Sequence, residues 1–145
     1  MHDKTVLLVE DNPDDEELAM RAFKKNRLSN NIRVARDGAE AIDYFFGPTK
    51  DSNPTPLLIL LDLKLPKIDG LEVLKRLRED DKTKHIPIVI LTSSDEEEDI
   101  AKSYCLGCNS YIRKPVDFQQ FVDAVKQVEL YWLVINVAPP ERVEV

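Results

Sequence analysis

The chain has 145 residues, the length of one domain, and its content of 43% hydrophobic and 32% charged residues is typical of a globular protein and excludes disorder. Twenty-seven acidic and 20 basic residues give a net charge of −7, which argues against nucleic acid as a partner, because neutralising phosphates needs a basic surface. The sequence opens with no basic-then-apolar leader and contains no apolar run of membrane-spanning length, so we expect a cytoplasmic protein with no membrane partner.

Three apolar runs and two shorter segments predict five β-strands. The third predicted strand is preceded by turn-forming prolines and contains five consecutive aliphatic residues, which is typical of a central strand buried on both faces. It ends directly in Asp62. In chain order, the predicted strands cover residues 4–9, 32–35, 57–61, 86–91 and 109–113.

Segments with apolar residues at helical spacing follow the predicted strands and predict five helices. Each helix is preceded by a polar residue that can cap the free N–H groups of the first turn. The predicted caps are Asn12, Asp37, Asp69, Ser94 and Asp117. After Asn12, the first turn contains the acidic run 14–17, which we interpret as favourable negative charge at the positive end of the helix dipole.

Strands that alternate with helices predict a doubly wound α/β fold, with a five-stranded parallel sheet and right-handed crossovers. In such a fold the carboxyl ends of all strands lie along one edge of the sheet, where ligands bind. The polar residues that follow or end the predicted strands should therefore gather at that edge. These residues are Glu10, Asp11, Asp62, Thr92 and Lys114.

Singly, each of these residues has an ordinary explanation as a strand-end turn residue or a surface charge. Together, three carboxylates would repel one another unless a cation held them, and oxygen ligands without histidine or thiolate favour a hard ion such as Mg²⁺. Lys114 adds a positive charge and Thr92 a hydroxyl donor. The set predicts a pocket for a dianionic group, with Asp62 as the nucleophile that accepts a phosphoryl group.

The sequence resembles the receiver domains of two-component response regulators, with a CheY-like size and fold. The resemblance covers residues 4–130 and implies a flavodoxin-like sheet in the order 2-1-3-4-5. Each motif is weak alone, but their order and spacing are specific. The motifs are Glu10-Asp11, Asp62 with the segment 65–70, Thr92-Ser93 and Lys114-Pro115.

The resemblance implies that a histidine kinase phosphorylates Asp62 and that the protein is not an enzyme beyond self-catalysed gain and loss of this group. It also implies Mg²⁺ bound by Asp11, Asp62 and the main-chain oxygen of Lys64, with Glu10 acting mostly through water. Many family members have aspartate at the position of Glu10, and the longer side chain here keeps the charge but can change the contacts made through water.

The resemblance further implies a switch. Thr92 and Lys114 contact the phosphoryl oxygens, and Tyr111 stands where the family often has an aromatic residue that turns inward when the threonine moves. The same resemblance implies that the peptide bond between Lys114 and Pro115 is cis.

Residues 1–130 are predicted to form the receiver domain and residues 131–145 a C-terminal extension, with no separate output domain. Together with the long loop before the third strand, this extension resembles small response regulators that partner bacterial phytochromes. Its beginning is apolar on almost every side, so we expect it to be covered by a second copy in a homodimer, although folding back on its own domain is an alternative. Its predicted interface residues are Tyr131, Trp132 and Ile135.

Three other functions fit less well. A phosphatase of the haloacid-dehalogenase type needs a second carboxylate two residues after Asp62, where this chain has Lys64. A scaffold that is never phosphorylated would be expected to have lost Asp62, Thr92 or Lys114. In a flavodoxin-like electron carrier, the acidic residues of segment 12–15 would repel a flavin phosphate.

Cys105 and Cys108 form a C-x-x-C motif that we interpret as two buried, reduced core residues. The motif closes a helix, with Gly107 as a C-cap residue, whereas a thioredoxin-like redox pair opens one. A zinc site would need two more ligands, and the chain has only two histidines, His2 and His85. Cys108 departs from the family, in which a small alanine-like residue is common at this position.

Overall fold

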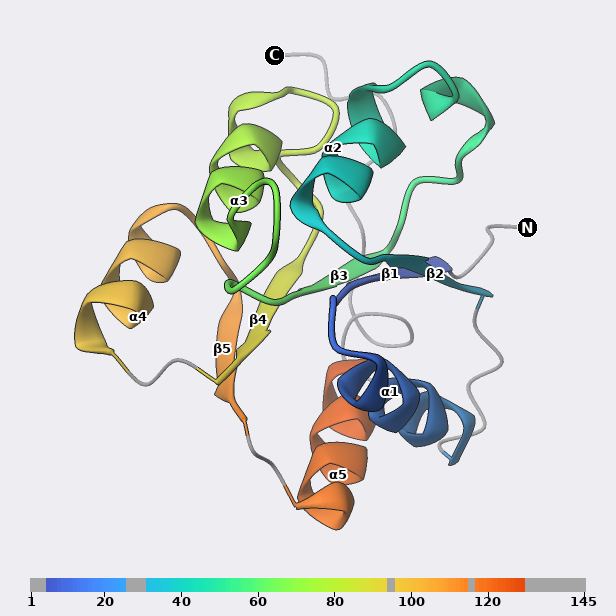
Figure 1. Ribbon diagram of the computed structural model, residues 1–145, viewed down its shortest axis with the longest axis vertical. Coiled ribbons are helices and arrows are strands. Elements are labelled where there is room, and N and C mark those ends of the chain that lie inside the picture. Colours follow the sequence, from blue (N-terminus) through green and yellow to red (C-terminus); the bar gives the residue numbers. More distant parts are fainter. Residues whose placement is uncertain (1–4, 26–30, 94–95, 115–116, 130–145) are drawn as a thin grey trace.

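The computed structural model describes residues 5–25, 31–93, 96–114 and 117–129. Within these ranges, five parallel strands form a single sheet in the order β2-β1-β3-β4-β5 (Figure 1). The predicted parallel sheet and its strand order are therefore confirmed. The strands are β1 (Thr5–Val9), β2 (Asn31–Ala35), β3 (Leu58–Leu61), β4 (Ile88–Thr92) and β5 (Ser110–Arg113).

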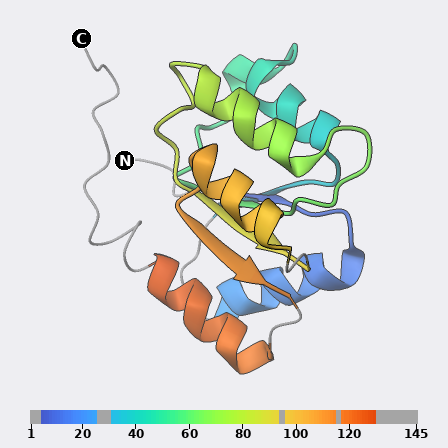
Figure 2. The same cartoon turned by 90° about the vertical axis from the view of Figure 1, so that its left-hand side faces the viewer.

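Helices cover both faces of the sheet, as a doubly wound fold requires. α1 and α5 lie on one face, and α2, α3 and α4 lie on the other (Figures 1 and 2). A short 3-10 helix, η1, follows α2 within the long loop that leads to β3. The helices are α1 (Pro13–Lys25), α2 (Gly38–Phe46), η1 (Lys50–Ser52), α3 (Gly70–Glu79), α4 (Glu97–Cys105) and α5 (Phe118–Glu129).

The central strands are buried on both faces because alternate side chains point into two separate apolar layers. In β1, Val6 and Leu8 pack with the side chains of α1 and α5, while Leu7 and Val9 pack with those of α2 and α3. The whole of β3 is buried in the same way. This packing fixes the register of the sheet and brings the residues that follow β1 and β3 to its carboxyl edge.

Four predicted helix caps are confirmed by hydrogen bonds from main-chain N–H groups to the side chains of Asn12, Asp37, Asp69 and Asp117. The predicted start of α4 at Ser94 is wrong. The helix begins at Glu97, Glu96 occupies the cap position, and Glu96 makes no side-chain capping bond. Three acidic residues in the first turn of α4 lie near its free N–H groups and provide the favourable charge instead.

The two cysteines differ in burial, so the prediction of two core cysteines is half wrong. Both are free, but Cys108 is buried and Cys105 is exposed. Cys105 is the last residue of α4, a helix that lies mostly on the surface and in which only Ser103 is buried. Gly107, with a φ of 99°, turns the chain back toward β5, as expected of a C-cap glycine.

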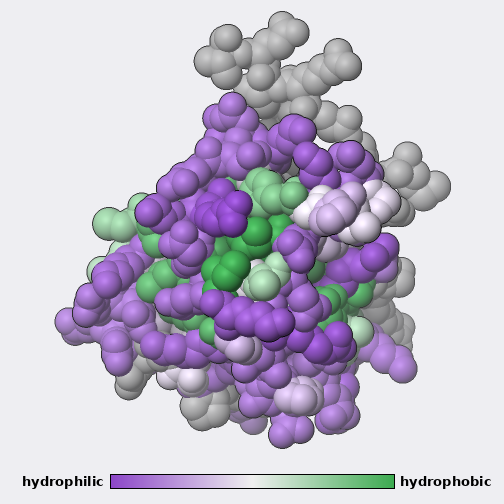
Figure 3. Space-filling view, turned by 45° about the horizontal axis from the view of Figure 1, so that its top comes forward, coloured by the Kyte–Doolittle hydropathy of each residue, from purple (hydrophilic) through white to green (hydrophobic). Residues whose placement is uncertain are grey.

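Hydrophilic side chains cover most of the surface on the side of α2 and α3, around a smaller hydrophobic area (Figure 3). Partly buried aromatic residues of α2, among them Phe45 and Phe46, pack against the core on this side. Arg76 of α3 lies over the ring of Phe46, 5.3 Å from its centroid, and shields part of this apolar surface.

Within the described ranges, every helix is too short or too polar to cross a membrane.

Candidate functional site

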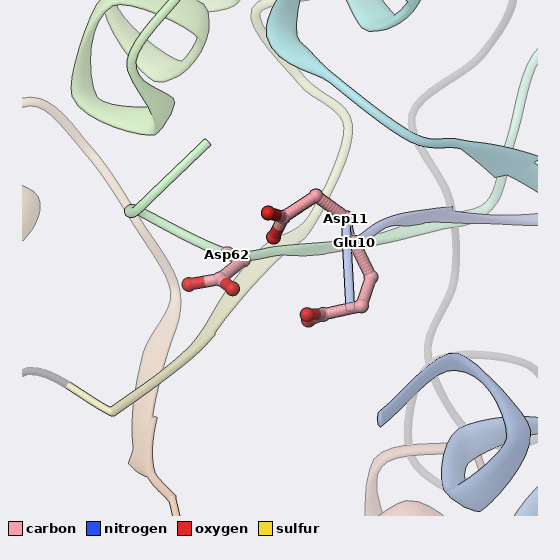
Figure 4. A group of neighbouring side chains, drawn as sticks. All are labelled: Glu10, Asp11 and Asp62. Atoms are coloured by element: carbon pink, nitrogen blue, oxygen red, sulfur yellow. The ribbon is translucent and has the colours of Figure 1, made fainter. Parts of the chain in front are cut away.

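The sheet brings the predicted site residues together at its carboxyl edge. Glu10 and Asp11 follow β1, and Asp62 follows the neighbouring strand β3, so the three acidic side chains converge on one region (Figure 4). The main-chain N–H of Asp62 donates to the carbonyl oxygen of Val9 at 3.0 Å, which extends the pairing of β1 with β3 to the start of the site. The parallel register therefore sets Asp62 beside the acidic pair.

These carboxylates form a donor set suited to a metal ion. One carboxylate oxygen each from Glu10, Asp11 and Asp62 lies within 4.8 Å of the others. Glu10 and Asp62 are buried, with 2% and 6% of their surface exposed, while Asp11 is open to water. Oxygen donors with access to water fit a hard divalent cation, which retains bound waters beside a few carboxylates.

The loop after Asp62 holds the carboxylate in place. The main-chain N–H of Lys64 donates to Asp62 Oδ1 at 3.2 Å, which keeps the Lys64 peptide next to the site. Gly70, the first residue of α3, lies so close to the main chain of Asp62 that a Cβ atom there would overlap the Asp62 carbonyl oxygen. Glycine therefore allows α3 to begin directly against the central acidic residue.

Lys114 is the cationic residue of the site. Its ammonium lies 2.9 Å from Glu10 Oε2, 2.9 Å from Asp15 Oδ2 and 3.3 Å from Asp62 Oδ2. The side chain is only 12% exposed, so these ion pairs are shielded from water. Since an ammonium has three N–H donors, the three carboxylates use all of them.

Burial and crowding shift the protonation of this cluster. Burial, reinforced by the nearby charge of Asp62, raises the pKa of Glu10 from 4.5 to about 7, although the hydrogen bond from Lys114 opposes the rise. Burial alone would lower the pKa of Lys114, but hydrogen bonds to Asp15 and Glu10 and the charge of Asp62 outweigh it and raise this pKa above its usual value. The ammonium is therefore fixed as a permanent positive charge.

Thr92 and Tyr111 lie on the strands next to this cluster. Thr92 ends β4 and is fully buried, and its carbonyl oxygen accepts a hydrogen bond from the Lys114 N–H at 2.7 Å. Tyr111 is half-buried in β5, opposite Ile90 and packed against the core. The structure thus places Thr92 next to Lys114, and Tyr111 on the adjacent strand.

One residue of the cluster was missed in the sequence. The sequence explains Asp15 by the helix dipole alone, yet its carboxylate binds Lys114. The available signal was its position, because Asp15 lies in the first turn of α1, which begins two residues after Asp11 at the same edge of the sheet. The predicted interface residues Tyr131, Trp132 and Ile135, and the Lys114–Pro115 peptide bond, lie outside the described residues and stay predictions.

Comparison with known proteins identifies the family. The model of the response regulator receiver domain matches residues 6–126. The probable methanogenesis regulatory protein FilR2 of Methanothrix harundinacea is 38% identical over 134 residues, which cover 92% of this chain and 86% of the relative. The response regulator Rcp1 of Synechocystis is 37% identical over 131 residues, which cover 90% of this chain and 89% of Rcp1.

Solved structures agree with this assignment. The Mn²⁺-bound form of Rcp1 superposes with a TM-score of 0.84 at 36% identity, covering 94% of this chain and 99% of that one. The phosphorylated cyanobacterial phytochrome response regulator RcpA gives a TM-score of 0.86 at 39% identity, covering 97% of this chain and 100% of that one. With its acidic site at the carboxyl edge of the sheet, the chain belongs to the response regulator receiver domains, a family of signalling proteins and not of classical enzymes.

Proposed function

We propose that this response regulator is switched by transfer of a phosphoryl group from a histidine kinase to Asp62. The observation that carries the proposal is the environment of the Asp62 carboxylate, with Oδ1 bound by the Lys64 N–H and Oδ2 3.3 Å from the buried ammonium of Lys114. A carboxylate oxygen of Asp62 attacks the phosphorus atom and forms a new O–P bond. The bond to the donor's nitrogen or oxygen breaks, and the donor leaves with the electron pair.

The cation of this site is proposed to be Mg²⁺, held by Asp11, Asp62 and the main-chain oxygen of Lys64, with Glu10 acting through water. The three-carboxylate donor set supports this ion, as does the Mn²⁺-bound structure of the relative Rcp1. When bound, Mg²⁺ supplies positive charge that offsets the repulsion between the carboxylates and an incoming phosphoryl group.

Lys114 and Thr92 are proposed to bind the phosphoryl oxygens of the modified protein. Charge-assisted hydrogen bonds to a dianion would draw the Thr92 hydroxyl toward the site, and Tyr111 would fill the space that it leaves. This movement would alter the surface formed by α4, β5 and α5 and so change the binding of partners. The same residues would serve self-catalysed phosphorylation and dephosphorylation.

The kinase partner is proposed to be of the phytochrome class, because RcpA, which is 39% identical to this chain, is a phytochrome response regulator. We also propose that residues 1–130 form the receiver domain and that the extension 131–145 joins two copies through Tyr131, Trp132 and Ile135. A cytoplasmic location, without a nucleic acid or membrane partner, belongs to the same proposal.

A phosphodonor assay tests the acceptor. Wild-type protein incubated with acetyl phosphate and Mg²⁺ should gain the mass of one phosphoryl group. Asp62→Asn should gain none, because an amide cannot form an acyl phosphate. Asp69→Asn is the matched control, since Asp69 lies exposed in the same loop and asparagine is an equally good helix cap. Labelling of Asp62→Asn at the wild-type level would refute the assignment.

A further inference from the structure

We propose that Asp15 acts through Lys114, competing with the phosphoryl group for its ammonium, and so favours the unphosphorylated state. This inference rests on the proposed function, because it concerns the residue that binds the phosphoryl oxygens. Asp15 Oδ2 lies 2.9 Å from Lys114 Nζ, as close as Glu10 Oε2 and closer than Asp62 Oδ2 at 3.3 Å.

The number of donors on Lys114 limits what this residue can bind. Its three N–H groups already face three carboxylates, and a phosphoryl group would bring three more oxygen acceptors to the same ammonium. Of the present partners, Glu10 is 2% exposed and would be costly to leave buried without its ion pair. The Asp15 side chain is 31% exposed and can turn toward water, so its bond to Lys114 is the one we expect to be given up.

The charge balance around Lys114 also favours loss of its contact with Asp15 on phosphorylation. Lys114 provides one positive charge to three carboxylates, which leaves these four groups with a net charge of −2 when all are ionised. Asp15 therefore consumes part of the positive charge that a phosphoryl dianion needs. An interaction that stabilises only the unphosphorylated state shifts the equilibrium away from the phosphorylated one.

Asp15 differs from its neighbour in the same turn of α1. Asp14 is exposed, and its carboxylate makes no ion pair with any residue that the structure describes, so the helix dipole explains Asp14 but does not fully explain Asp15. Asp15 also lies outside the group of three carboxylates that can hold a metal ion. Its role is therefore on the ammonium side of the site and can be separated from metal binding.

The test compares wild-type protein with Asp15→Asn, Asp14→Asn and Asp15→Glu. Mg²⁺ affinity is first measured for each protein, so that all assays can be run at saturating Mg²⁺. The readouts are the initial rate of phosphorylation by acetyl phosphate, the apparent affinity for beryllofluoride, which mimics a phosphoryl group, and the urea midpoint of the unphosphorylated protein.

Asp15→Asn should raise the rate and the beryllofluoride affinity about two- to five-fold, the size expected for an ion pair with a partly exposed partner. It should also lower the urea midpoint slightly, because the ion pair with Lys114 is lost. A purely structural residue would change the midpoint alone. Asp14→Asn, which removes the same charge one residue away, should leave all three readouts close to wild type. Asp15→Glu, which keeps the carboxylate, should behave like wild type.

Two results would overturn this role. If Asp15→Asn matches Asp14→Asn, Asp15 does not compete for Lys114. If Asp15→Asn is phosphorylated more slowly than wild type, Asp15 orients Lys114 for the reaction instead of competing for it. Both results leave the proposed function intact, whereas a wild-type protein that accepts no phosphoryl group on Asp62 would overturn the proposed function together with this role.

Discussion

Burial of the Glu10 carboxylate has an electrostatic cost that can be measured. This carboxylate is buried beside Asp62, and burial first, then the charge of Asp62, raises its pKa from 4.5 to about 7. In the unfolded chain the group returns to the lower value. Folding therefore takes up a proton between these two pH values, and the stability linked to neutral Glu10 is present below pH 4.5 and lost as the pH rises through about 7.

Replacement of Glu10 by Gln should remove this dependence. With metal chelated, Glu10→Gln should have a higher melting temperature than wild type at pH 8, and this gain should shrink toward pH 5. Thermal unfolding at several pH values measures the difference, with Glu17→Gln, an exposed acid of α1, as the control. A gain that is the same at pH 5 and pH 8 would show that the pKa of Glu10 is not raised by folding.

Single residues were predictable where they directly end or follow a predicted strand. Asp62 and Lys114 were found in this way, because the strand pattern alone places them at the carboxyl edge of the sheet. Asp15 was missed because an acidic residue at a helix start already has a sufficient local explanation. Its contact depends on how far the Lys114 side chain reaches, which no periodicity in the sequence reports.

At the scale of elements, the loop between β3 and α3 rests on the start of α2. The N–H of Gly38 donates to the carbonyl oxygen of Pro66 at 3.3 Å, and Lys67 Nζ lies 3.4 Å from Asp37 Oδ2. A Cβ atom on Gly38 would overlap the main-chain oxygen of Ile68. This contact supports the same loop whose N–H binds Asp62.

Gly38→Ala should therefore destabilise the protein by about 1–3 kcal/mol, the usual cost of overpacking a close contact. The effect runs against helix propensity, since alanine in a helix is ordinarily better than glycine. Chemical denaturation measures the loss, and a Mg²⁺ titration should show weaker binding because the shifted loop includes the proposed main-chain ligand at Lys64. Unchanged stability and Mg²⁺ affinity would show that the two elements are not coupled.

Elements were predicted well where burial gives a strong pattern. The strands β1, β3 and β4 were recognised as apolar runs, and β2 and β5 as shorter segments between predicted helices. Four caps were recognised because a polar residue precedes an apolar helix face. The start of α4 was misplaced because Ser94 and Glu96 both precede the helix and are both polar, and the helix itself buries only Ser103. An element with so little contact to the core leaves a weak periodic signal, which is also why the exposure of Cys105 was not foreseen.

For the whole molecule, the proposed homodimer depends on the apolar residues after Leu130. Trp132→Glu would place a charge in the proposed interface and should give a monomer that still accepts a phosphoryl group on Asp62. Sedimentation of both proteins, with and without phosphorylation, measures the change. If wild-type protein sediments as a monomer at high concentration in both states, the extension does not join two copies.

The acceptor residue can be located directly by chemical trapping. An aspartyl phosphate is an acyl phosphate, which borohydride reduces to homoserine, so the modified residue keeps a permanent mark after digestion. Wild-type protein is treated with acetyl phosphate and Mg²⁺, reduced and analysed by peptide mass spectrometry. We predict homoserine at position 62 alone, and none when Mg²⁺ is chelated. Homoserine at another aspartate, with position 62 unmodified, would contradict this prediction.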